Sequence, residues 1–376
     1  MTSLLILTVG TGTAGSKSNI AQGLANSLRK VQPRLFWLLP SASADSQTTA
    51  DMIRESVTDL NAFSPVSDAQ PYRLIGNPDD IHECRQVVRS SILQARLSRR
   101  PGELLVINPT SGTKQMSAGA TLAALDEEVD RVDFTGGQRQ NGVVMTGSEV
   151  IQSFDIGGFL FQRDLRSANQ LFEQGAFQAA ARLLESHQRP SNPIGLQALQ
   201  TALCLHEWQR MNYLKASSHA AKFSQPLCDH LKMLASVDPL SSQAVGDLLA
   251  GADELLRWGD AEEALARYYR GAEALAKHRL AEAHGIQEKG LTAVNAWEML
   301  ANKRADPFGK AYFSSSSLHQ LLQRRNVSVY GHGHEPVEPN LVRSVATELR
   351  ALIQPHLPQV DALWTVGLRP RSLPTG

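Results

Sequence analysis

The pattern of apolar and polar residues changes once along the chain, near Gly157-Gly158. Before this point, short apolar runs typical of buried strands alternate with stretches whose apolar residues recur every three or four positions. The predicted strands are residues 4–9, 35–39, 72–75 and 104–107, with 129–134 and 143–146 as a closing pair. The predicted helices are residues 18–31, 51–60, 79–97 and 114–125. This alternation predicts a mostly parallel sheet that is covered by helices on both faces.

Beyond the two glycines, almost every segment has the helical period of 3.6 residues. The predicted helices are residues 164–186, 195–209, 241–257, 260–283, 291–301, 314–330 and 339–353. Proline-containing breakers at 187–193, 236–240 and 304–309 separate some of them. We therefore predict a Rossmann-like α/β domain over residues 1–155 and an all-helical domain over residues 160–376.

The amino-acid composition argues against several classes of function. The 376 residues contain 37 Lys and Arg and 37 Asp and Glu, so the chain has no net basic charge. This argues against a protein that binds nucleic acid through many phosphate contacts. One small basic cleft is still compatible with this composition. Cys84, Cys204 and Cys228 lie far apart and form no C-x-x-C pair, so neither a disulfide scaffold nor a cysteine-built zinc site is expected. There is no signal peptide and no apolar run of membrane-spanning length, so we expect a cytoplasmic protein without membrane contact.

The first candidate site follows the first predicted strand, in the stretch ILTVGTGTAGSKSN at residues 6–19. Gly10, Gly12 and Gly15 complete a G-x-G-x-x-G pattern. A P-loop would need lysine directly after the last glycine, where Ser16 stands. A dinucleotide site would need an acidic residue at the end of the second strand, and the next one, Asp45, lies beyond it. Both an ATPase and an NAD(P)-dependent enzyme are therefore disfavoured.

A second loop, NPTSGTKQMSAG at residues 108–119, follows the fourth predicted strand. Like the first, it combines glycine, hydroxyl side chains and the start of a helix. Both loops should lie at the carboxyl edge of the sheet, where open α/β sheets bind ligands. Backbone N–H groups, hydroxyls and Lys114 at the helix start would hold an anion there without a metal. The alternative is that these residues only form tight turns and cap helices.

The two loops resemble the ligand loops of the CARF domain of CRISPR-associated proteins, which senses cyclic oligoadenylate. The resemblance covers the α/β domain, and the Thr-Ser-Gly-Thr-Lys-x-Met-Ser run is its more specific part. It implies a cyclic tetra- or hexa-adenylate as activator. It also implies a homodimer, because two such domains pair and the ring lies across the dimer axis. The implied ligand-binding residues are Gly10, Thr11, Gly12, Thr13, Thr110, Ser111, Gly112, Thr113 and Lys114.

The helical half contains LLQRRNVSVYGHGHEP at residues 321–336. Arg325, Asn326 and His332 form R-N-x5-H, which resembles the R-x(4–6)-H motif of HEPN ribonucleases. The Arg-Asn-x-Ser and His-Gly parts are similar to the Csm6-like branch of CARF–HEPN ribonucleases, although Tyr330-Gly331 stands where an aliphatic residue and alanine are usual. A second histidine, His334, follows, so the choice between His332 and His334 stays open.

The resemblance implies a metal-independent endoribonuclease that cuts single-stranded RNA in a type III CRISPR defence system. Histidine titrates near neutral pH and can move the proton of a 2′-hydroxyl or of the leaving oxygen. Arginine binds the phosphate oxygens, and Asn326 would orient the histidine or the phosphate. Neither a cofactor nor a metal is expected. Two alternatives remain: a non-catalytic sensor whose helical domain binds a partner, and a ring nuclease that degrades its own cyclic oligoadenylate.

Overall fold

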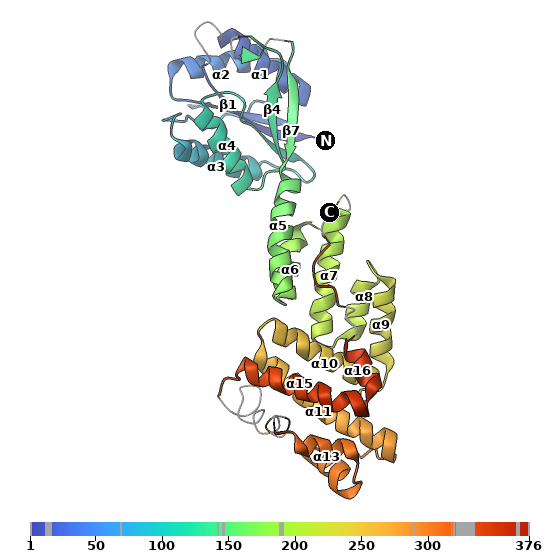
Figure 1. The fold of residues 1–376 in the computed structure, drawn as a ribbon. Coiled ribbons are helices and arrows are strands. Elements are labelled where there is room, and N and C mark those ends of the chain that lie inside the picture. Colours follow the sequence, from blue (N-terminus) through green and yellow to red (C-terminus); the bar gives the residue numbers. More distant parts are fainter. Residues whose placement is uncertain are drawn as a thin grey trace. The chain divides into compact units, whose positions relative to one another are not determined.

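The structure is a computed structural model that describes residues 2–11, 17–67, 70–140, 143–144, 147–187, 192–288, 290–316, 318, 320, 335–365 and 369–374. The chain forms two compact units, Met1–Arg163 and Asp164–Gly376, and Figure 1 shows the elements of each. The first unit contains a sheet with helices, and the second is helical. This confirms the predicted fold class.

The main sheet of the first unit has the strand order β2-β1-β3-β4-β7. Strands β2, β1, β3 and β4 are parallel, and β7 is antiparallel to β4. All seven residues of the central strand β1 are buried, which explains why its sequence is mostly apolar. The strands are β1 (Ser3–Val9), β2 (Leu35–Pro40), β3 (Leu104–Asn108), β4 (Arg131–Gly136) and β7 (Val150–Asp155).

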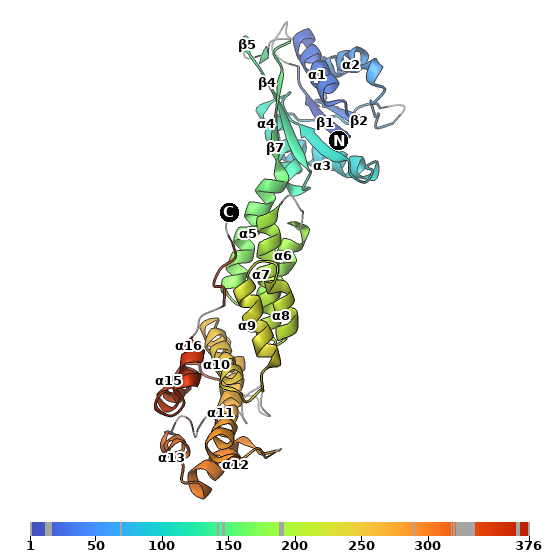
Figure 2. The same ribbon diagram turned by 90° about the vertical axis from the view of Figure 1, so that its right-hand side faces the viewer.

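Helices cover both faces of this sheet (Figure 1, Figure 2). Alternate residues of β1 point to opposite faces, so Leu5 and Leu7 share one core with α1 and α2, while Leu4 and Ile6 share another with α3 and α4. The bounds of the helices are α1 (Lys17–Val31), α2 (Ala44–Ser56), η1 (Thr58–Leu60), α3 (Ile81–Leu97) and α4 (Lys114–Asp126). The two-sided covering follows the prediction from the alternating pattern.

Three details differ from the sequence-based expectation. Residues 72–75 form no strand, and only Ile75 makes a single bridge, to Ser41. The partner that closes the sheet beside β4 is β7, whereas Val143–Val144 (β6) pairs with Arg139–Gln140 (β5) in a separate hairpin. Helix α2 begins at Ala44 rather than at residue 51, because the Ser43 hydroxyl caps it by accepting a hydrogen bond from the Ser46 N–H.

The second unit is built from consecutive helices, and those from α10 to α16 contribute to one large core. Trp297 and Tyr312 stack inside this core with ring centroids 3.9 Å apart. Helices α8, α9 and α16, and all but the last residue of α13, lie where no helix was predicted. Most of the helix predicted at 314–330 lies outside the described residues. The bounds are α5 (Ile156–Glu173, which begins in the first unit), α6 (Phe177–Leu184), η2 (Glu185–His187), α7 (Pro193–Gln209), α8 (Tyr213–Ala220), α9 (Gln225–Ser236), α10 (Ser242–Arg257), α11 (Ala261–His284), α12 (Ala293–Glu298), the π-helical turn η3 (Met299–Lys303), α13 (Pro307–Ser314), α15 (Pro339–His356) and α16 (Pro358–Thr365).

In the part of the chain that the structure describes, no helix has both the length and the apolar character needed to cross a membrane.

A buried ion pair at the base of the sheet makes stability depend on pH. Arg34, just before β2, donates to both carboxylate oxygens of Glu103, just before β3, with Nη2–Oε2 at 2.9 Å. Glu103 is 3% exposed. The hydrogen bond from Arg34, assisted by the backbone N–H of Arg100, outweighs burial and lowers the pKa of Glu103 from 4.5 to about 2.

Because the folded state holds this carboxylate ionised, its contribution is present above pH 4.5 and is lost as the pH falls toward 2. We expect the free energy of unfolding of Glu103→Gln to vary with pH by on the order of 1–2 kcal/mol less than that of the wild type over this range. This is less than the full pKa shift would give, because solvent reaches Arg34. Urea unfolding across this pH range measures it. Asp59→Asn in the exposed Arg29–Asp59 pair is the control. An unchanged pH slope in Glu103→Gln would contradict the prediction.

Candidate functional site

The loops that follow β1 and β3 contact each other at the carboxyl edge of the sheet. The Thr8 hydroxyl donates to the backbone carbonyl of Ser111, and the backbone N–H of Gly10 donates to the Ser111 hydroxyl over 3.0 Å. Strands β1 and β3 are neighbours in the sheet, with Leu7 beside Asn108. This pairing brings together two loops that lie about a hundred residues apart in the sequence.

Each of the two loops depends on a glycine. A Cβ atom on Gly10 would lie 2.4 Å from the Cα of Gly112. Gly112 has a φ of +119°, which favours glycine, and a Cβ there would lie 2.8 Å from the Met116 side chain. Gly10 therefore lets the two backbones approach, and Gly112 lets the second loop adopt its own backbone conformation.

The hydroxyls of the second loop have different roles. Thr113 caps α4 by accepting from the Met116 N–H over 3.1 Å, and it donates its proton to the Pro78 carbonyl. Its hydroxyl is thus used within the fold. Thr110 accepts from the Thr135 N–H over 2.7 Å, and Ser111 accepts from Gly10. Because these two hydroxyls act as acceptors, their own protons can be donated to a ligand.

The cationic group of this edge is Lys114, the first residue of α4. Its side chain is exposed and makes no ion pair with any residue that the structure describes. The N-terminus of a helix carries partial positive charge and unpaired N–H groups, so the two together favour an anion. Thr11 is half-buried in the first loop. Gly12 and Thr13 lie outside the described residues.

Two buried polar residues support the second loop from below. The Asn108 amide donates to the Thr135 hydroxyl over 3.0 Å, and its oxygen accepts from the Thr110 N–H over 3.1 Å. The hydroxyls of Ser27 and Thr135 lie 3.2 Å apart. Asn108, Thr135 and Ser27 were not predicted as site residues. Asn108 could have been found from the sequence, because it is a polar residue at the end of the apolar run LLVIN. Thr135 could not, because the strand predicted for residues 129–134 ended one residue before it.

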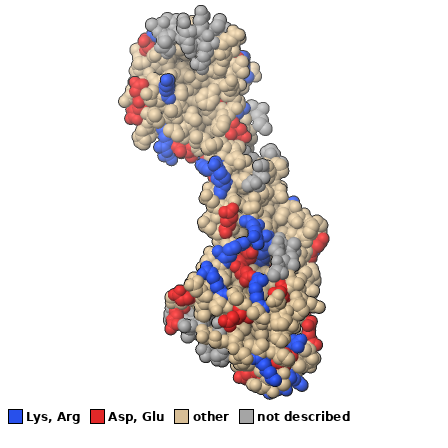
Figure 3. All heavy atoms as spheres, viewed as in Figure 1, with Lys and Arg blue, Asp and Glu red and all other residues tan. Residues whose placement is uncertain are grey.

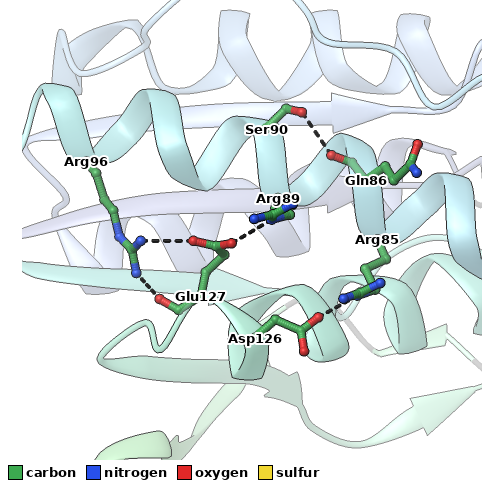
Figure 4. A network of polar contacts seen from close by, with 7 residues as sticks. All are labelled: Arg85, Gln86, Arg89, Ser90, Arg96, Asp126 and Glu127. Atoms are coloured by element: carbon green, nitrogen blue, oxygen red, sulfur yellow. Dashed lines mark hydrogen bonds and ion pairs between the residues drawn. The ribbon is translucent and has the colours of Figure 1, made fainter.

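Helix α4 is held in place by ion pairs to α3, drawn in Figure 4. Arg85 contacts Asp126, and the carboxylate of Glu127 accepts from Arg89 and Arg96 over 2.6 and 2.9 Å. The carboxylates lie at the end of α4, and the arginines lie along α3. This network fixes the helix whose other end carries Lys114.

In the helical unit, the predicted catalytic residues Arg325, Asn326 and His332, together with His334, lie outside the described residues. The chain on either side of them is anchored. Before them, the Tyr312 hydroxyl donates to the Leu318 carbonyl over 3.1 Å. After them, the Val337 N–H donates to Glu262 on α11 over 2.8 Å. The motif is thus joined at both ends to the core of the helical unit.

Arginine side chains also gather around a pocket of about 450 Å³ in the helical unit, visible as blue side chains beside red ones in Figure 3. Arg369 contacts Asp247 over 3.2 Å, and Arg350 contacts Asp253. Each of these aspartates also accepts from a tryptophan N–H and a tyrosine hydroxyl; the donors are Trp208 and Tyr213 for Asp247, and Trp364 and Tyr268 for Asp253. These paired charges link α10 to α15 and to the segment around Arg369, after α16, which accounts for the two arginines as structural residues.

Among the residues that the structure describes, no group of three or more His, Cys, Asp and Glu side chains is arranged to hold a metal ion.

This protein is similar to a known protein in structure but not in sequence. No family model matches the chain, and no curated protein matches it in sequence. Among solved structures, the chain is similar to Enterococcus italicus Csm6 bound to cyclic hexa-2′-fluoro-hexa-dAMP, with a TM-score of 0.69 and 12% sequence identity. The match covers 96% of this chain and 97% of that chain. The protein therefore has the fold of Csm6 along almost its entire length.

Proposed function

We propose that this protein is a cyclic oligoadenylate-activated, metal-independent endoribonuclease that cuts single-stranded RNA in a type III CRISPR defence system in the cytoplasm. Residues 1–155 would form the CARF-like sensor, and residues 160–376 the HEPN-like ribonuclease. One observation carries the proposal: the loops after β1 and β3 meet at the carboxyl edge of the sheet, in a fold whose solved counterpart holds cyclic hexa-2′-fluoro-hexa-dAMP.

The activator would bind where these loops meet. Lys114 and the start of α4 supply positive charge for its phosphates. The hydroxyl protons of Thr110 and Ser111 are oriented by the bonds that these groups accept. Gly10, Thr11, Gly12 and Thr13 would complete the site from the first loop, and Gly112 and Thr113 would shape the second.

The active protein would be a homodimer. Phe134, Val150 and Phe154 lie on one face of the β4–β7 pair, because directly opposed and alternate residues share a face. All three are exposed, and the ring of Phe159 lies 6.1 Å from that of Phe154. Exposed apolar side chains that adjoin one another are typical of an interaction surface. A second copy of the chain would cover them, and each protomer would contribute an arginine and a histidine to one composite catalytic cleft.

In that cleft His332 would move the proton and Arg325 would stabilise the charge on the phosphate, with Asn326 orienting one of them. The expected products are a 2′,3′-cyclic phosphate (or a 3′-phosphate) and a 5′-hydroxyl.

The test incubates the protein with labelled single-stranded RNA and EDTA, with cyclic tetra-adenylate or cyclic hexa-adenylate in separate reactions. We expect cleavage in the presence of one ring and none in its absence, and the ring of six is the first to try. If a ring binds but no RNA is cut, the sensor alternative replaces the ribonuclease. Chromatography of the ring after incubation would reveal ring-nuclease activity. Binding of neither ring would contradict the proposal as a whole.

A further inference from the structure

A lysine lies at the start of two helices at the carboxyl edge of the sheet. Lys17 is the first described residue of α1, and Lys114 is the first residue of α4, after its cap Thr113. Each helix follows one of the adjacent parallel strands β1 and β3, so both begin at the same edge. The N-terminal end of a helix carries partial positive charge, which disfavours a lysine there. Helix stability therefore does not explain either residue.

The two lysines differ in their partners. The first turn of each helix contains no acidic residue that could balance the lysine locally. Lys17 is instead paired with Asp45, in the first turn of α2, which follows the neighbouring strand β2. Their side chains are 38% and 62% exposed. An exposed pair of this kind is weak, so a competing anion can replace the carboxylate.

We propose that Lys17 is a second phosphate-binding cation of this site and that Asp45 holds it until a phosphate of the ligand displaces the carboxylate. The inference rests on the proposed function, since the anion is a phosphate of a cyclic oligoadenylate. A lysine suits such an exchange because its ammonium group is a point charge with three donors on a flexible stem. Lys114 and Lys17 would then neutralise phosphates bound at the ends of two adjacent strands.

A double-mutant cycle tests this exchange. Fluorescently labelled cyclic hexa-adenylate and cyclic tetra-adenylate are titrated with the wild type, Lys17→Gln, Asp45→Asn and the double variant. We expect Lys17→Gln to weaken binding about tenfold and Asp45→Asn to strengthen it about two- to fivefold. In the double variant the gain from Asp45→Asn should disappear, because Lys17 is no longer there to be released.

Salt dependence gives a second readout. A lost phosphate contact should lower the slope of log affinity against log salt concentration by about 0.7 in Lys17→Gln. Lys215→Gln in α8 is the matched control and should change neither affinity nor slope. Thermal unfolding shows whether each variant is folded.

The outcomes separate this inference from the proposed function. If the wild type binds a ring and Lys17→Gln binds it with the same affinity and slope, the inference is wrong while the proposed function stands. If Asp45→Asn strengthens binding equally with and without Lys17, Asp45 acts only by repelling the ligand, and the exchange is also wrong. If the wild type binds neither ring, both the proposed function and the inference are overturned.

Discussion

His332→Ala and Arg325→Ala are each expected to lower ring-activated RNA cleavage by about 10²–10⁴-fold. The histidine would transfer a proton to or from the reacting oxygens, because an imidazole group commonly titrates near neutral pH. The arginine would stabilise the negative charge that develops on the phosphate. Initial rates with a labelled RNA at saturating ring concentration measure both effects. Ring binding should remain unchanged, because the proposed ring site lies in the α/β unit.

His334→Ala is the matched control for the choice of histidine. It removes the neighbouring imidazole and leaves the R-N-x5-H spacing intact, so cleavage should persist. If His334→Ala does not cut RNA while His332→Ala does, His334 rather than His332 is the catalytic histidine. If all three alanine variants cut as fast as the wild type, the HEPN-type mechanism is wrong.

Gly10→Ala is expected to weaken ring binding by at least about tenfold and to destabilise the α/β unit by about 1–3 kcal/mol. The added methyl group would lie 2.4 Å from the Cα of Gly112, which is backbone and cannot turn aside as a side chain can. The loops must therefore separate, and the hydrogen bond from Gly10 to Ser111 is lost with their contact. Titration with labelled ring and denaturant unfolding measure the two effects.

Gly23→Ala provides the control for a glycine replaced within the same unit. A Cβ there would meet Glu149 at 3.6 Å, an ordinary contact, and the site lies inside α1, where alanine is favoured over glycine. This variant should be at least as stable as the wild type and should bind the ring normally. Normal ring binding by Gly10→Ala would show that the contact between the loops does not shape the site.

The elements that could be predicted were those with a strong local pattern. Strands β1 and β3 are mostly apolar because both of their faces are buried. Strand β7 escaped prediction because it lies at the sheet edge and most of its residues are exposed, so burial does not shape its sequence. The false strand at 72–75 shows the opposite error, since Tyr72 and Ile75 are buried in loop conformation.

In the helical half, too, the elements with a strong local pattern were the ones predicted. The long helix α11 was predicted closely because its buried positions recur at helical spacing over 24 residues. Helices α8 and α9 were missed: α8 is only eight residues long and buries only Ala216, Ser217 and Ala220, small residues that leave a weak pattern. Packing against α7 and α9 compensates for that weak local signal.

The sequence alone determined most of the order of strands and helices, the change from an α/β to a helical half, and the residue types of the two loops, because these depend on local periodicity and on turn chemistry. Only the tertiary structure decided how the loops are used. It brought Gly10 against Gly112, assigned the Thr113 hydroxyl to a helix cap, and paired Lys17 with Asp45. These contacts join residues on different strands and helices, and their partners depend on strand order and register, which no local pattern contains.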